Sequence, residues 1–193
     1  ARGVGRSESQ ETCPGADPHP VFAGGPGQVI ASLFVVGGAR SGKSRYAVER
    51  SPAEGRIVFV ATAEALDEDM ARRIARHRAE RPPHWTTIEE PLALVPRLEK
   101  LEGTCDAFVV DCLTLWVANR LLQGECDDAI LEEADALARL IGRRRSGFIV
   151  VSNEVGEGVH PETEAGRRFR DLLGGVNQRV AAACDTVVLM VAG

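Results

Sequence analysis

The sequence predicts an α/β fold, a mostly parallel sheet with helices on both of its faces. Three observations support this prediction. Five short segments are continuous apolar runs, which is typical of parallel strands that are buried on both sides. Segments with the period of an amphipathic helix separate these runs, and alternation of strands with helices indicates a layered α/β domain. A glycine-rich stretch, "GGARSGKS", lies between the first apolar run and the first helical segment.

Composition limits what the chain can do. Its 193 residues carry a formal net charge of −5, which argues against bulk binding of nucleic acid. No apolar run is long enough to span a bilayer, and no secretory leader is visible, so we expect a cytoplasmic protein. Residues 1–28 are rich in Gly, Pro and Ser without periodicity, and we expect them to be a disordered extension. Residues 29–193 are then predicted to form one domain.

The apolar runs are predicted as five strands, and each is short and bounded by polar or turn-forming residues. The predicted strands cover residues 29–36, 56–62, 106–111, 147–154 and 186–191.

Two helices are predicted in the first half of the chain. The first covers residues 43–50 and follows the glycine-rich stretch directly. The second covers residues 66–81, and Pro82 and Pro83 end it because proline cannot continue a helix. One face of this second helix carries Leu66, Met70, Ile74 and His77.

Four further helices are predicted in the second half, at residues 92–102, 113–123, 127–145 and 162–184. We expect Pro96 to disturb the first of them and Gly174–Gly175 to break the last. The helix over 127–145 begins with acidic residues and ends with Arg143–Arg145, a polarity that suits the helix dipole. We therefore interpret the arginine run as a solvated helix end rather than a binding patch.

The glycine-rich stretch matches the phosphate-loop pattern G-x-x-x-x-G-K-[ST], and it has the required position between a strand and a helix. Its glycines let backbone N–H groups converge on phosphate oxygens, and the helix N-terminus adds positive potential. Lys43 can reach the β- and γ-phosphates, and the Ser44 hydroxyl can ligate Mg²⁺. The alternative is an ordinary glycine turn. The predicted phosphate loop consists of Gly37, Gly38, Ala39, Arg40, Ser41, Gly42, Lys43 and Ser44.

A site of this kind also needs a carboxylate at the end of a neighbouring strand to hold the metal. Asp111 follows the apolar run of the third predicted strand and fits this role. It could instead cap the following helix, or do both. Glu154 ends another strand, and from the sequence it is equally a metal or water partner or a polar loop residue. The sequence lacks the N-K-x-D tetrapeptide that reads guanine in regulatory GTPases.

His77 is the other candidate for chemistry. It lies in a run of arginines, and nearby cations disfavour an imidazolium, so we expect a neutral ring that can act as a nucleophile. The same arginines could bind substrate phosphates. On spacing alone, however, a buried structural histidine that continues the apolar stripe is the more frequent outcome. The arginines concerned are Arg73, Arg76, Arg78 and Arg81.

The motifs together resemble a known family. In order and spacing, the chain is similar to the bifunctional adenosylcobinamide kinase / adenosylcobinamide-phosphate guanylyltransferases of cobalamin biosynthesis. The resemblance rests on "GGARSGKSR", "FVATAEALDEDMARRIARHRAERPPHW", "VVDCLTLWVAN", "VVSNEVGEGVHPE" and "GRRFRDLLGGVNQRVAAACD". It runs from about Leu33 to the C-terminus and implies a RecA-like P-loop fold.

The resemblance also implies two consecutive reactions. A nucleoside triphosphate, ATP or GTP, phosphorylates adenosylcobinamide. GTP then guanylylates a histidine, and the GMP passes to adenosylcobinamide phosphate to give adenosylcobinamide-GDP. The histidine of the family corresponds to His77, which reverses the weighting that spacing alone gave. The family forms homotrimers, so a homotrimer is the expected assembly.

Further site residues follow from the same resemblance. Besides the phosphate loop, the implied nucleotide contacts are Thr62, Ala63, Glu64, Arg78, Ala79, Glu80, Arg81, Glu89 and Asp111. Candidates for corrinoid contacts are Asn153, Glu154, Arg170 and Asn177. Two departures from the family are visible. The first 28 residues have no counterpart, and the sequence stops at "VAG" where relatives continue.

Two alternative functions remain open at the level of sequence. A P-loop kinase of another small metabolite would use the same loop, with His77 structural. A nucleotide-dependent binding module or switch would bind nucleotide without turnover.

Overall fold

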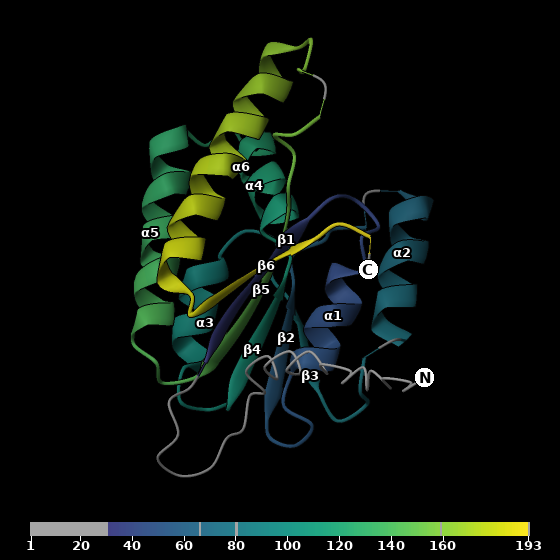
Figure 1. Cartoon of the computed structure of the whole chain (residues 1–193), viewed down its shortest axis with the longest axis vertical. Coiled ribbons are helices and arrows are strands. Elements are labelled where there is room, and N and C mark those ends of the chain that lie inside the picture. The colour runs from purple at the N-terminus through teal and green to yellow at the C-terminus, as the bar shows by residue number, and fades with distance from the viewer. Residues whose placement is uncertain (1–30, 66, 80, 159, 193) are drawn as a thin grey trace, which may run out of the picture.

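A computed structural model describes residues 31–65, 67–79, 81–158 and 160–192 (Figure 1). The expected disorder of residues 1–28 and the place of Leu66 on the second helix lie outside these residues. Six strands form one sheet in the order β3-β2-β4-β5-β1-β6, and every pairing in it is parallel. The strands are β1 (Ser32–Gly37), β2 (Ile57–Ala61), β3 (Thr86–Glu89), β4 (Ala107–Asp111), β5 (Gly147–Asn153) and β6 (Thr186–Met190).

Helices cover both faces of this sheet, which confirms the predicted fold class. In Figure 1, α3 to α6 lie on one face, and α1 and α2 lie on the other. The helices are α1 (Lys43–Arg50), α2 (Glu68–Ala79), α3 (Leu94–Leu101), α4 (Leu113–Leu122), α5 (Asp127–Gly142) and α6 (Glu164–Ala183). No helix in the described part of the chain has the length and apolar character to cross a membrane.

The sheet separates two apolar cores, because successive strand residues point to opposite faces. Phe34, Phe108 and Phe148 point to the face covered by α3 to α6 and join the larger core. Leu33, Val35 and their neighbours point to the face of α1 and join the smaller core, which also holds Trp85. Because successive residues of a strand enter different cores, the strands are apolar on both sides and read as continuous apolar runs.

Four details differ from the sequence-based expectations. Strand β3 was not predicted, because a four-residue edge strand is too short to show a period. Pro96 does not disturb α3, since it lies in the first turn, where its missing N–H has no helical partner to lose. The helix α6 runs unbroken through Gly174 and Gly175. A Cβ built on Gly175 would stand 3.2 Å from Leu131 of α5, so close helix packing offsets the weak helix propensity.

The fourth difference concerns where the helix before the arginine run ends, whereas the run itself is exposed at the helix end, as expected. Helix α5 ends at Gly142, and the arginines follow it. Arg143 pairs with Glu99 at 3.1 Å, Arg145 lies 3.8 Å from Glu102, and Arg144 pairs with Asp185. These ion pairs link the end of α5 to α3 and to the start of β6.

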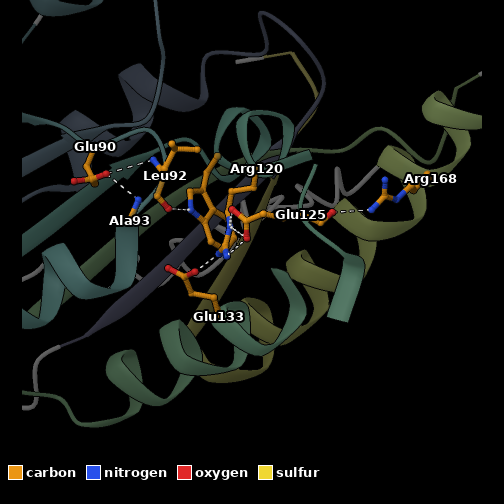
Figure 2. Close-up of polar contacts among 8 residues, drawn as sticks. Glu90, Leu92, Ala93, Arg120, Glu125, Glu133 and Arg168 are labelled. Atoms are coloured by element: carbon orange, nitrogen blue, oxygen red, sulfur yellow. Dashed lines mark hydrogen bonds and ion pairs between the residues drawn. The ribbon is translucent and has the colours of Figure 1, made fainter. Parts of the chain in front are cut away.

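Helices α4, α5 and α6 are joined by a polar cluster around Arg120 (Figure 2). The Arg120 guanidinium is buried and pairs with both Glu125 and Glu133. The carbonyl of Glu125 accepts a hydrogen bond of 2.9 Å from Arg168 on α6. Because a buried charge without a partner costs several kcal/mol, this cluster fixes how the three helices pack.

Candidate active site

The predicted site residues come together at the carboxyl edge of the sheet. The parallel register places Gly37 opposite Asn153, Asp111 opposite Ala61, and Ala61 opposite Glu89. The phosphate loop, Asp111, the segment after β2 and Glu89 therefore lie along one edge. Asp111 is in register with Val151 of β5, which pairs with Val35 of β1, two residues before Gly37. Since neighbouring strands are about 4.8 Å apart, the Cα atoms of Asp111 and Val35 stand roughly 10 Å apart, with β5 between them.

The phosphate loop has the backbone of a nest. Gly42 at φ 88° and Arg40 at φ 59° are both left-handed, a conformation that turns successive N–H groups toward one point. Lys43 is buried, and its Nζ donates to the carbonyl of Gly38 and to Ser41 Oγ at 3.4 Å. The loop thus positions the ammonium over its own centre. Of the other loop residues, Gly38, Ala39 and Arg40 are exposed, and Ser44 is half-buried at the start of α1.

Asp111 ends β4, and its main chain is held by Thr62. The Thr62 N–H donates to the carbonyl of Asp111 at 3.1 Å. The Thr62 hydroxyl donates to the carbonyl of Cys112 at 2.7 Å and accepts from its N–H at 2.8 Å. The carbonyl of Thr62 in turn accepts a hydrogen bond of 2.8 Å from the side-chain amide of the buried Asn119. Cys112, not Asp111, is the N-cap residue of α4, so the capping role is excluded and the carboxylate is left for the site.

His77 lies beside Asp111. Its Nδ1 is 3.7 Å from Asp111 Oδ2, and the two side chains are 24% and 12% exposed. One residue further along α2, Arg78 pairs with Glu89 on β3 at 2.9 Å. The last turn of α2 therefore meets the sheet edge through two polar contacts. His77 is half-buried at a charged surface, which argues against a purely apolar structural role.

Arg81 lies near Asp111 and packs against an aromatic ring. Its guanidinium stacks over Phe59 at 3.6 Å from the ring centroid, and Phe59 in turn stacks on Trp85. Burial lowers the pKa of Arg81, and the nearby Asp111 carboxylate opposes that shift. Trp85 Nε1 and Arg81 Nε are buried without a hydrogen-bond partner among the described residues. Sequence reasoning gave Phe59 no role, although an aromatic near the end of a buried strand is a usable signal.

The candidate corrinoid residues lie at the end of β5 and along α6. Asn177 donates 3.1 Å to the carbonyl of Asn153, and the Glu154 N–H donates 3.0 Å to the carbonyl of Gly37. These contacts support the base of the phosphate loop. Arg170 is instead bonded to His160 at 2.7 Å and to Asp171.

Three other predicted contacts lie near the cluster without a hydrogen bond or ion pair that joins them to its described residues. Ala63 and Glu64 are half-exposed after β2, and Ala79 is exposed at the end of α2. Glu80 and the side chain of Arg73 lie outside the described residues. Thr62 reaches the edge, but its hydroxyl already has both a donor and an acceptor partner.

The oxygen donors at this edge suit Mg²⁺. A hydroxyl at Ser44 and a carboxylate at Asp111 are hard ligands, and Mg²⁺ takes few protein ligands besides water and phosphate oxygens. Among residues 31–192, with 66, 80 and 159 left aside, no group of three or more His, Cys, Asp or Glu is arranged to hold a metal.

Comparison with known proteins decides the family. The profile of the family described as "Cobinamide kinase / cobinamide phosphate guanyltransferase" matches residues 33–193. The chain belongs to this family. Cobinamide kinase and cobinamide phosphate guanylyltransferase, acting in cobalamin biosynthesis with nucleotide substrates, are therefore the activities of this chain, and the resemblance found in its motifs is confirmed.

Individual relatives agree with the family assignment. A bifunctional adenosylcobalamin biosynthesis protein from Pseudomonas aeruginosa is 47% identical over 164 residues, covering 83% of this chain and 92% of its own. Proteins of the same description from Salmonella typhimurium and Escherichia coli are 39% and 36% identical, each covering 83% of this cobinamide kinase/guanylyltransferase chain and 96% of their own. A solved ATPase of a bacterial type III secretion system matches with a TM-score of 0.51 at 12% identity. The match covers 82% of this chain and 50% of the ATPase chain. This likeness confirms the RecA-like fold alone.

Proposed function

We propose that His77 carries the guanylyl group in an enzyme that makes adenosylcobinamide-GDP in two steps. ATP or GTP first phosphorylates adenosylcobinamide, and GMP from GTP then passes through His77 to adenosylcobinamide phosphate. One observation supports this proposal above the others. His77 stands at the same sheet edge as the phosphate loop, 3.7 Å from Asp111, rather than inside the apolar core.

The kinase step uses the loop residues. N–H groups of the nest and of the α1 N-terminus bind the phosphate oxygens, and Lys43 neutralises charge that builds on the transferred group. The ammonium is already held over the loop by Gly38 and Ser41, so little reorganisation is needed when phosphate binds. The hydroxyl of adenosylcobinamide attacks the γ-phosphorus, and the nucleoside diphosphate leaves.

The guanylyl step uses the last turn of α2. The imidazole of His77 attacks the α-phosphorus of GTP, and pyrophosphate leaves. Arg78 and Arg81 supply positive charge for the phosphates. A phosphate oxygen of adenosylcobinamide phosphate then attacks the same phosphorus and frees the histidine.

Mg²⁺ would be held by the Ser44 hydroxyl and the Asp111 carboxylate, together with phosphate oxygens. It supplies charge neutralisation on the phosphates when bound. For Asp111→Ala we expect a higher Mg²⁺ concentration for half-maximal kinase activity, whereas an unchanged metal dependence would remove Asp111 from the metal site.

The deciding experiment is to incubate the protein with α-labelled GTP and Mg²⁺. We expect label on the protein that is labile to acid and stable to alkali, and His77→Ala should abolish it. His84→Ala is the matched control, because His84 is an exposed histidine outside α2, and it should label normally. An unlabelled wild-type protein that still phosphorylates cobinamide would leave a kinase with a structural His77.

We also propose that the enzyme works in the cytoplasm, where nucleoside triphosphates are available, and as a homotrimer. The exposed side chains of Val187 and Leu189 on the edge strand β6 provide apolar surface for a subunit contact. Sedimentation should give about three times the chain mass of 20.7 kDa. A mass of one chain at micromolar concentration would contradict the trimer.

A further inference from the structure

We propose that Asp111 is a positioning residue for His77, and that it selects Nε2 of the imidazole as the atom that accepts the guanylyl group. The proposal rests on the proposed function of His77 and adds the atom and the partner that directs it.

Asp111 is placed to act as a fixed acceptor. Its main chain lies in register with Ala61 in the sheet, and its carbonyl accepts the bond from Thr62 N–H. Its side chain is only 12% exposed, so the carboxylate has little freedom to swing away. The Oδ2 atom faces His77, which leaves Oδ1 for another partner. One carboxylate can therefore serve both the metal role and the histidine.

The imidazole has one nitrogen toward this carboxylate. Nδ1 is the ring atom 3.7 Å from Asp111 Oδ2, a distance of ion-pair range, and catalytic contacts of this kind shorten when substrate binds. Arg78 is engaged with Glu89, so it does not compete for Asp111, and Arg81 is stacked on Phe59. A carboxylate that faces Nδ1 favours the tautomer with the proton on Nδ1, because an N–H rather than a lone pair must meet the acceptor.

The Nε2 lone pair forms a bond to the α-phosphorus of GTP, and the bond from that phosphorus to the bridging oxygen breaks, with its electron pair leaving on pyrophosphate. The proton stays on Nδ1, where the Asp111 carboxylate stabilises the positive charge that develops on the ring. When a phosphate oxygen of adenosylcobinamide phosphate attacks the phosphorus, the N–P bond breaks and its pair returns to Nε2.

The first test needs no nucleotide. Long-range ¹H–¹⁵N correlation spectra of the metal-free protein at about pH 8.5, well above the ordinary pKa of histidine, report which ring nitrogen carries the proton. His77 signals are assigned by their loss in His77→Gln. We expect Nδ1–H in the wild type and a change to mainly Nε2–H in Asp111→Ala. Asp106→Ala is the matched control, since it removes a carboxylate at the opposite end of β4, where Asp106 bonds Arg56, and the tautomer should not change.

The second test locates the bond. Phosphorus NMR of the denatured, guanylylated protein distinguishes the two ring nitrogens, and we expect GMP on Nε2 in the wild type. The rate of labelling should fall roughly 10- to 100-fold in Asp111→Ala, the range seen when an outer partner of a histidine is removed. Because loss of a metal ligand would also slow labelling, the tautomer and the linkage position are the deciding readouts.

The outcomes separate the two proposals. A wild-type ring in the Nε2–H form, or GMP on Nδ1, overturns the role of Asp111 even if labelling is normal. No label on a protein whose ring is in the Nδ1–H form removes the guanylyl function of His77 but not its contact with Asp111. If Asp111→Ala does not fold, the wild-type tautomer and linkage still decide.

Discussion

Helices α1 and α2 lie on the same face of the sheet, and each follows a strand that ends at the candidate site (Figure 1). The two helices are attached to the sheet in very different ways. In the β1–α1 unit, the phosphate loop follows β1, which pairs with β5 on one side and β6 on the other. Helix α1 buries Lys43 and Ala47 against the sheet. The unit β2–α2 carries His77, and no described side chain of α2 is fully buried. Its last turn is attached through the contacts of His77 and Arg78. The unit with the phosphate-loop motif is thus built into the core, whereas the unit with His77, the proposed guanylyl acceptor, is joined to it by a few polar contacts.

The largest effect is expected for a substitution in the β1–α1 unit. Lys43→Ala should lower both the kinase and the guanylyltransferase rate by about 10³-fold, because the same ammonium serves the phosphates in both steps. Steady-state assays of each half-reaction measure it. Lys100→Ala removes the other lysine of the chain, exposed on α3, and should retain both rates. If Lys43→Ala kept full activity, the assignment of the loop would be wrong.

A second variant tests how tightly the β1–α1 unit is packed. A Cβ on Gly37 would stand 2.2 Å from the carbonyl oxygen of Met190, so Gly37→Ala should force β6 away from β1. We expect a loss of about 1 to 3 kcal/mol in the free energy of unfolding, measured by urea denaturation. Gly38→Ala meets nothing within 4 Å and should stay within about 0.5 kcal/mol of the wild type. Equal stabilities for the two variants would contradict the close contact.

Hydrogen exchange compares the two helices directly. Segments with few buried apolar contacts open most readily, so amides of α2 should exchange at least about tenfold faster than those of α1. Arg78→Ala should accelerate exchange in α2 further while changing global stability by less than about 1 kcal/mol, because the pair with Glu89 is 60% exposed on both sides. Equal protection of α1 and α2 would contradict a difference in attachment between the two helices.

The smallest effect concerns the end of β1 that is remote from the loop. Bonds from Arg144 and Ser32 hold the pKa of Asp185 below its usual value. A lowered folded-state pKa gives stability that is present above pH ~4 and is lost as pH falls below it. Asp185→Asn should therefore cost up to about 1 kcal/mol at neutral pH and flatten the loss of stability between about pH 5 and pH 3. Asp171→Asn, which breaks an exposed pair with Arg170, is the control and should change the pH profile less.

Much of the fold and part of the site could be predicted from local patterns. Strand β1, the loop and α1 follow from one apolar run and one motif, and the carboxyl edge follows from parallel pairing. Strand β3 could not be predicted, because four residues at an edge carry no period. The unbroken α6 could not either, since what keeps Gly175 helical is Leu131 on another helix.

The contact between His77 and Asp111 has no local signal at all. It joins α2 to the end of β4, and the sequence shows the two residues only as a histidine among arginines and an acid after an apolar run. Arg81 over Phe59 is a contact of the same kind. Family resemblance supplied a role for His77, but only the packing of α2 shows which carboxylate it meets.

The place of β1 between β5 and β6 has a consequence for biosynthesis. The backbone of Ser32 is bonded to Asp185, 153 positions later, and the strand that leads into the phosphate loop gains both of its neighbours only from the last two strands. At a translation rate of roughly 5 to 20 residues per second, the ribosome needs about 8 to 30 s to make that intervening stretch. The phosphate-loop motif is translated early, but the strand that leads into it is completed only by β6, so a nascent chain should be unable to bind GTP until β6 has emerged.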